Sequence, residues 1–176
     1  GDNPKLVFCD FDDRVFYYNV SEGLVEINKG TLKIKAVWAA DNGAIYMLSD
    51  TNPISLYEYK NNNITLLFTL NIEFENVTYT PRVKEVIPGV AVIYINNYNL
   101  YKFYITEYLG VEIPNLLRYN LNGETFESWA AVYSPNFQDG IHSGYKLLIR
   151  NEVGIKDINT NTYPITDSNG NKAYTI

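Results

Sequence analysis

Three aspartates near the start of the chain have the side chains best suited to chemistry. Asp10, Asp12 and Asp13 lie at the end of an apolar stretch that begins at Leu6. Carboxylates are the hard oxygen ligands that Ca²⁺ and Mg²⁺ bind in proteins. Because Asp12 and Asp13 also suit a turn that bonds its own backbone, we expect an exposed hairpin turn here. A metal site at the three acids is the alternative.

The order Phe8-Cys9-Asp10-Phe11-Asp12 resembles the first motif of haloacid-dehalogenase-type phosphatases. The resemblance implies that Asp10 is a nucleophile and Asp12 a general acid, with Mg²⁺ between them. The Thr of the family motif is replaced by Arg14, and residues 14–20 have the pattern of a strand where the family has a helix. We therefore expect a protein that is not an enzyme and needs no cofactor, with a Mg²⁺-dependent hydrolase as the alternative.

His142 is the only histidine of the chain. Asp139 is nearby, and Ser143 or Ser134 would be the nucleophile of a triad built around this base. These residues share one Gly-bounded loop, and sequence neighbours in a loop rarely form a triad. The pattern favours an exposed loop histidine with a role in binding.

Tyrosine and asparagine dominate the composition, with 16 Tyr and 22 Asn in 176 residues. Most Tyr side chains in a β-protein pack across strands, but exposed Tyr beside Asn is typical of surfaces that recognise proteins or sugars. We expect such surfaces in the loops Asn96–Asn99 and Tyr133–Gly144. The predicted binding residues are Tyr98, Tyr133, Asn136, Asp139, His142 and Tyr145.

Charge and hydropathy narrow the class of partner. The net charge is −6 and no basic stripe is present, which argues against nucleic acid. The longest apolar run, Val90–Ile95, is too short to span a bilayer, so we expect no membrane insertion. The single cysteine, Cys9, allows no intrachain disulfide and suits a small buried position. Protein or glycan remains as partner, and the oligomeric state is open.

Three glycosylation sequons begin at Asn19, Asn63 and Asn76. Glycosylation at these sequons would place the protein outside the cell or on a virion, although a chain this rich in Asn contains about as many sequons by chance. The Asn/Tyr/Ile-rich composition resembles that of surface and virion proteins of thermoacidophilic archaea and their viruses. We expect an extracellular or virion-surface location, with a cytoplasmic one as the alternative.

Period-2 alternation and β-branched residues predict strands along almost the whole chain. Four Tyr- or Ile-rich strands followed by Asn/Gly turns end at Tyr18, Tyr59, Tyr119 and Ile158, separated by 41, 60 and 39 residues. A period near 40 predicts stacked or radial units. Tyr residues from 94 to 108 have helical spacing, but their surroundings favour a hairpin; a short helix at Thr106–Leu109 is the alternative.

The strand–turn–strand units, and the recurrence of Trp38-Ala39-Ala40 as Trp129-Ala130-Ala131, resemble a β-propeller without WD or kelch signatures. The resemblance implies an all-β, propeller-like single domain, 1–176, of about four antiparallel units at roughly 5–31, 32–74, 75–129 and 130–170. A β-sandwich is the alternative. Because the chain starts at Gly1 rather than Met, we expect a fragment of a longer protein.

The expected function is recognition or structure rather than catalysis. Loop-rich β architecture and Tyr/Asn enrichment predict a module of an extracellular or virion surface that binds protein or glycan. The alternatives are the hydrolase that uses Asp10 and Asp12, and an intracellular scaffold for protein interactions.

Overall fold

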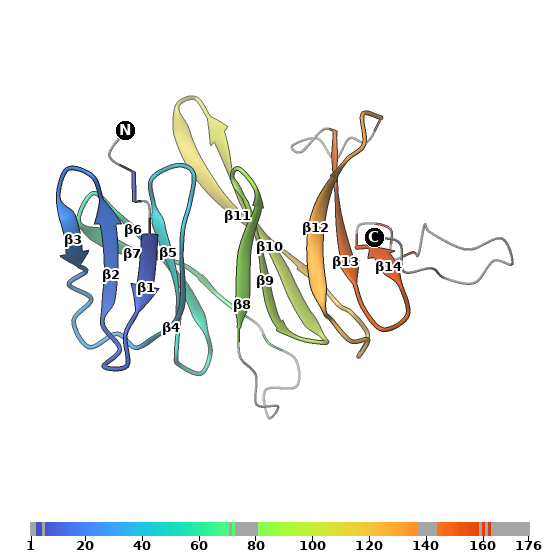
Figure 1. The fold of residues 1–176 in the computed structure, drawn as a ribbon, viewed down its shortest axis with the longest axis horizontal. Helices are drawn as coiled ribbons and strands as arrows, with labels where there is room; N and C mark the ends of the chain where they lie inside the picture. The colour runs from blue at the N-terminus through green and yellow to red at the C-terminus, as the bar shows by residue number, and fades with distance from the viewer. Residues whose placement is uncertain are drawn as a thin grey trace, which may run out of the picture.

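The computed structural model of the chain describes residues 3–4, 6–70, 72, 81–136, 144–158, 160 and 162. This part contains strands and turns and no helix. Its 14 strands form four antiparallel sheets, each made from strands that are consecutive in the chain (Figure 1). No helix within the described ranges is long and apolar enough to cross a membrane. The all-β prediction is therefore confirmed.

The sheets follow one another along the sequence, each with its strands in chain order. The first sheet contains β1 (Leu6–Cys9), β2 (Val15–Asn19) and β3 (Gly23–Glu26). The second contains β4 (Ile34–Ala39), β5 (Ile45–Ser49), β6 (Ser55–Lys60) and β7 (Asn63–Thr69). The third contains β8 (Arg82–Ile87), β9 (Val90–Asn96), β10 (Asn99–Tyr108) and β11 (Val111–Tyr119). The fourth contains β12 (Ser128–Tyr133), β13 (Tyr145–Arg150) and β14 (Ile155–Asp157).

Turn chemistry explains why neighbouring strands pair as tight hairpins. Asn61 and Asn62 connect β6 to β7 with φ of 51° and 62°, the left-handed conformation that a two-residue hairpin turn needs and that Asn tolerates. Leu109 and Gly110 connect β10 to β11 in the same way, with φ of 51° and 77°. The Tyr-rich segment is thus the hairpin that its composition favours. The short helix at Thr106–Leu109 is not present, because β10 runs to Tyr108.

The four sheets stand in a row and their faces pack against one another (Figure 1). The first strands of successive sheets, β1, β4, β8 and β12, are in contact. The first and fourth sheets lie at opposite ends of the row, which does not close into a ring within the described residues (Figure 1). The row thus has two outer sheet faces, one on the first sheet and one on the fourth.

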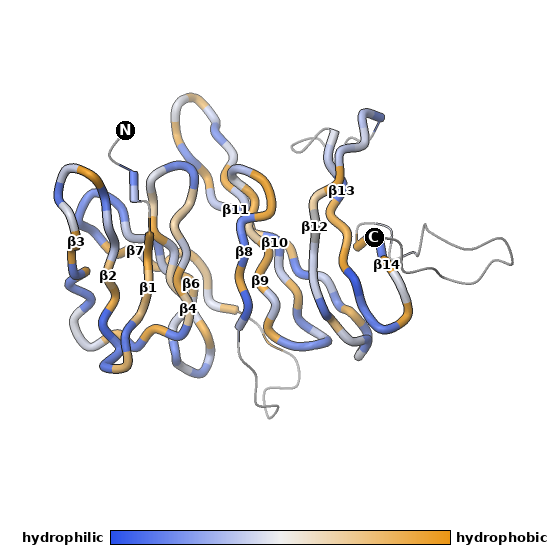
Figure 2. Tube along the Cα trace, in the orientation of Figure 1, coloured by the Kyte–Doolittle hydropathy of each residue, from blue (hydrophilic) through white to orange (hydrophobic). Residues whose placement is uncertain are grey.

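Three apolar cores lie between the sheets, and their apolar strands are visible in Figure 2. The core between the first and second sheets includes Val15, Tyr17, Ile34, Ile45 and Met47. The core between the second and third includes Trp38, Tyr46, Leu56, Ile93 and Phe103. The core between the third and fourth includes Val92, Leu100, Leu147 and Ile149. Alternate residues of β5 and of β9 enter different cores, as the two-residue period of a strand requires.

The repeated segments of the sequence do not occupy equivalent places in the sheets. The segment that ends at Tyr119 belongs to β11, and the Asn122-Gly123 turn after it leads to the next sheet rather than closing a hairpin. β12 begins at Ser128, just before the boundary expected at residue 130. The two Trp residues lie in first strands, β4 and β12, but both pack toward the third sheet, from opposite sides.

Candidate binding surface

Tyr133 and Tyr145 form an exposed aromatic pair, which we call the tyrosine platform. They are cross-strand partners in the β12–β13 hairpin, with ring centroids 5.7 Å apart and planes at 67°. Tyr133 is 68% exposed and Tyr145 is 41% exposed, as the sequence predicted. Gly144 lies beneath Tyr133, and a Cβ there would be 3.4 Å from the ring. The platform offers two flat apolar faces and two hydroxyl groups to a partner.

The register places the platform on the face of the fourth sheet that packs against the third. Tyr145 has the same parity on β13 as Leu147 and Ile149, which are buried against the third sheet. Tyr133 has the same parity on β12 as Trp129, which packs on the same core. The tyrosine platform therefore lies on the same face of the fourth sheet as the residues that pack against the third sheet, but outside the area that the third sheet covers.

A second exposed apolar group lies at the end of the β10–β11 hairpin. We call it the apolar hairpin; its members are Tyr108 (68% exposed), Leu109 (85%), Val111 (62%) and Ile113 (42%). Tyr108 shares a face of the third sheet with Leu100, which is buried against the fourth sheet. Both hairpins reach the same edge of the molecule, the upper edge in Figure 1. Leu109 adds a large exposed side chain at positive φ, a conformation that is uncommon for residues other than Gly, Asn and Asp.

The other predicted binding residues are placed differently. Tyr98, expected to be exposed, is half-buried, and its hydroxyl lies against Gly123. Asn96 and Asn99 are buried, and the Oδ1 of Asn96 accepts hydrogen bonds from the backbone N–H of Tyr98 and the Nδ2 of Asn99. The Asn96–Asn99 loop is thus a turn whose buried amides form hydrogen bonds within the protein, including one that Asn99 Oδ1 accepts from Arg118 Nε at 2.9 Å. Asn136 is exposed, while Asp139 and His142 lie outside the described residues.

Side-chain contacts around Arg82 hold the fourth sheet against the third, and we call them the Arg82 contacts. Arg82, the first residue of β8, lies 4.9 Å from the Phe126 ring and 5.4 Å from the Trp129 ring. Its guanidinium donates to the carbonyl of Glu127 at 2.9 Å. The rings of Tyr94 and Phe126 stack at 4.4 Å. These contacts fix where β12 and β13, and with them the tyrosine platform, lie relative to the third sheet.

A small apolar cavity of about 40 Å³ lies between the second and third sheets. Its lining includes Trp38, Ala40, Tyr46, Ala91, Phe103 and Ile105. Ligand pockets are typically several hundred Å³, so this cavity has room for a water-sized group only. We regard it as a packing defect of the core rather than as a ligand site.

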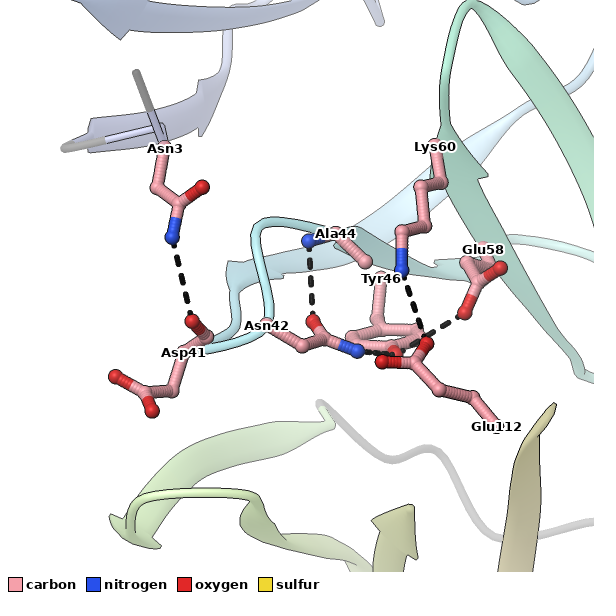
Figure 3. A network of polar contacts seen from close by, with 8 residues as sticks. All are labelled: Asn3, Asp41, Asn42, Ala44, Tyr46, Glu58, Lys60 and Glu112. Carbon is pink, nitrogen blue, oxygen red and sulfur yellow. Dashed lines mark hydrogen bonds and ion pairs between the residues drawn. The ribbon is translucent and has the colours of Figure 1, made fainter. Parts of the chain in front are cut away.

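A polar network lies beside this cavity and is drawn in Figure 3. The Tyr46 hydroxyl accepts from the Nδ2 of Asn42 at 3.0 Å and donates to Glu58 at 3.1 Å. Burial is the largest cause of a raised pKa for Tyr46, and the carboxylate of Glu58 adds to it. Lys60, at the end of β6, pairs with Glu112 of β11 at 2.9 Å. This pair ties the apolar hairpin to the second sheet.

The aspartates that the sequence singled out form the turn between β1 and β2. Asp12 and Asp13 are exposed in this turn, as expected, but the carboxylate that bonds the backbone is that of Asp10. It accepts the N–H groups of Asp12 and Arg14, and Arg14 Nε at 2.7 Å. Partial burial alone would raise the pKa of Asp10, but these hydrogen bonds together lower it.

The surroundings of this turn do not fit the phosphatase resemblance. The segment after Asp12 is strand β2, not a helix, and both carboxylate oxygens of Asp10 are engaged within the turn. Nowhere in the described part of the chain do three or more His, Cys, Asp or Glu side chains gather as metal ligands do. Cys9, expected to be buried, is half-buried, and its burial raises the pKa of its thiol.

An open polar pocket of about 410 Å³ lies next to this turn. Its charged lining residues are Asp12, Arg14, Glu26 and Lys29. Lys29 Nζ donates to the carbonyl of Leu32 at 2.7 Å. Two acids and two bases in one open pocket create no strong preference for an anion or a cation.

Two of the three sequons lie in the described part of the chain, and their acceptors differ in access. Asn19 is 4% exposed, and its Nδ2 donates to Glu22 at 2.7 Å while its Oδ1 accepts the N–H of Glu22. Asn63 is exposed at the start of β7. Asn76 lies outside the described residues. Only the Asn63 acceptor of this pair is open to a glycosylating enzyme.

Comparison with known proteins adds no relative, since no family model, no curated protein and no solved structure matches the chain.

Proposed function

We propose that this domain is a non-catalytic recognition module that binds a polypeptide partner through the tyrosine platform and the apolar hairpin. The observation that carries the proposal is the exposure of Tyr133 and Tyr145 as a contacting aromatic pair. Exposed aromatic side chains on a rigid sheet are typical anchors of protein interfaces. The aliphatic members of the apolar hairpin favour a polypeptide over a sugar, since sugars bind mainly through aromatic faces and hydrogen bonds.

The two groups act together in this proposal because both hairpins reach one edge of the molecule (Figure 1). Each group gathers several exposed apolar side chains, which make a larger contact than the single exposed side chains found on most soluble proteins. In the unbound protein, the Lys60–Glu112 pair positions the apolar hairpin, and the Arg82 contacts position the β12–β13 hairpin. A surface arranged in advance loses less conformational entropy on binding.

We propose an extracellular or virion-surface location for this module, on the basis of its Tyr/Asn-rich composition and the exposed sequon at Asn63. The resemblance to propellers and to archaeal and viral surface proteins stays a prediction from the sequence.

Selection of a random-peptide phage library on the immobilised protein tests the proposal. We expect the enriched peptides to carry aromatic and aliphatic residues, and to lose about tenfold in affinity with Tyr133→Ser or Ile113→Asn. Leu66→Asn is the matched control, because Leu66 is 53% exposed on β7, which belongs to a different sheet from either hairpin. Equal binding to the Tyr133→Ser protein would refute the proposed surface. Binding to a glycan array that depends on Tyr133 would replace the polypeptide by a sugar.

A further inference from the structure

The outer face of the first sheet is apolar. Cross-strand register places Leu6 beside Tyr18, Phe8 beside Phe16, and Tyr18 beside Leu24, all on one face. Leu6 is 56% exposed, Phe8 36%, Tyr18 41% and Leu24 61%. The alternate residues of the same strands, such as Val15 and Tyr17, are buried against the second sheet. None of the other described sheets covers the outer face, because the first sheet stands at the end of the row (Figure 1).

This face has the composition of a packed face rather than a solvated one. An antiparallel sheet with one face in water normally alternates apolar and polar residues. Here β1 reads Leu-Val-Phe-Cys, apolar on both faces, and the rings of Phe8 and Phe16 stack at 5.4 Å on the outer side. The inner sheets of the row, which are covered on both sides, have strands of the same kind, such as β9 (Figure 2). The first sheet therefore matches a sheet that is covered on both sides.

The outer face of the fourth sheet differs. Residues of β13 that alternate with the buried Leu147 and Ile149 include Lys146 and Arg150, and Lys146 pairs with Asp157 at 3.7 Å. Asp157 is already buried, but a head-to-tail stack of copies would also bury the partly exposed Lys146 and Arg150 against the apolar outer face of the first sheet. Burial of charged groups against apolar surface is costly. The two ends of the row are thus poor partners for each other.

We propose that a second copy of this chain covers the outer face of the first sheet, with first sheet packed on first sheet around a two-fold axis. A two-fold interface uses the same patch twice, so the patch must complement itself. This patch offers both signs of charge beside its apolar residues. Arg14, which also pairs with Asp10 of its own turn, lies 5.4 Å from the Phe16 ring, and Glu26 is the cross-strand neighbour of Phe16, so a two-fold axis near Phe16 would bring Arg14 of each copy toward Glu26 of the other. An apolar centre with a polar rim is the usual anatomy of a protein interface.

The dimer would leave the tyrosine platform free. The first sheet and the β12–β13 hairpin lie at opposite ends of the row (Figure 1), so each copy keeps its tyrosine platform exposed. Two recognition surfaces on one particle raise the avidity for a partner that carries repeated sites. This consequence rests on the proposed function, whereas the dimer itself does not.

Sedimentation velocity over a range of protein concentrations tests the dimer. We expect the 20.2 kDa chain to sediment as a dimer at the higher concentrations, and Leu24→Lys to raise the dissociation constant by about 100-fold or more. Two control variants carry the same change at exposed apolar positions elsewhere. They are Leu66→Lys on β7, and Val132→Lys at a 42% exposed position on the outer side of the fourth sheet. Unchanged far-ultraviolet circular dichroism shows that each variant is folded.

Amide chemical shifts on dilution give a second readout that needs no variant. The proposal expects concentration-dependent shifts in β1–β3 and constant shifts in β12–β14. A protein that is monomeric at every concentration would overturn the proposal, as would a dimer that Val132→Lys disrupts and Leu24→Lys does not. Protection of β1–β3 in a monomeric longer chain would assign the face to a segment of that chain instead.

Discussion

Gly123→Ala is expected to destabilise the protein about twice as much as Gly89→Ala, although the two glycines have nearly the same backbone conformation. Gly89 has φ of 82° and Gly123 has φ of 78°. A Cβ at either position therefore costs about 1 kcal/mol for the left-handed conformation. A Cβ on Gly89 meets nothing within 4 Å, whereas one on Gly123 lies 2.8 Å from the Tyr98 hydroxyl and 3.3 Å from its Cζ.

The steric contact adds to the conformational cost at Gly123 only. Forcing a half-buried ring to move costs about 1 kcal/mol or more, which brings Gly123→Ala to about 2 kcal/mol. The melting temperature should then fall by about 2–4 °C for Gly89→Ala and about 4–8 °C for Gly123→Ala. The contact matters for the site because Gly123 N–H also donates to the carbonyl of Asn97, which links the β9–β10 turn to the segment that leads into β12.

Thermal unfolding with denaturant titration measures both variants, and a double-mutant cycle with Tyr98→Phe isolates the contact. Removing the hydroxyl deletes the nearest atom, so Tyr98→Phe should recover roughly half of the additional cost, and the two sites should be coupled by about 0.5 kcal/mol. Equal destabilisation by the two glycine variants would refute the reasoning, because it would mean that Tyr98 does not lie over Gly123. Absence of coupling in the cycle would refute it independently.

Three further predictions follow from the core, the ionisable groups and the sequons. Phe103→Ala should lower the unfolding free energy by about 3–5 kcal/mol in denaturant titration, since this ring contacts both Trp38 and Tyr46; a loss below about 1 kcal/mol would contradict the packing between the second and third sheets. Burial, with Tyr59 and Glu22 nearby, raises the pKa of Tyr17 to about 12 from 10.0, so the stability that neutral Tyr17 contributes is complete below pH 10 and is lost as the pH rises toward 12. Between pH 10 and 12, the melting temperature of the Tyr17→Phe protein should fall less steeply with pH than that of the unchanged protein. Equal slopes for the two proteins would count against the burial of the Tyr17 hydroxyl. Protein secreted from a glycosylating host should carry glycan on Asn63 and none on Asn19 by peptide mass spectrometry, and glycan on Asn19 would show that its hydrogen bonds to Glu22 do not persist.

Local patterns predicted the strands and many of the turns. Alternation along the chain indicated β structure, Asn61-Asn62 indicated a hairpin turn, and Asp12-Asp13 indicated an exposed one; the structure has all three. The exposure of Tyr133 and Tyr145 was also predicted, from their place beside a Gly-containing loop. These features depend on a few neighbouring residues, whose allowed φ values and two-residue period are properties of the sequence itself.

Other predictions failed where burial depends on distant segments. Tyr98 and Asn99 were expected on an exposed loop, yet Asn99 is fully buried and accepts a hydrogen bond from Arg118, 19 residues later in the chain. The Leu109-Gly110 turn was missed because Leu is uncommon at positive φ. The segment from Leu116 to Thr125 was expected to be a hairpin, because the same strand–turn pattern serves both a hairpin and a connection between sheets.

The amino-acid sequence by itself determined that this protein is all-β and that many of its strands are joined by Asn- and Gly-containing turns. The tertiary structure alone decided which face of each sheet is covered. It set the tyrosine platform beyond the edge of a packed core and left the apolar face of the first sheet at the end of the row. The physical reason is that alternation tells which residues share a face, but not which other sheet, if any, packs against it.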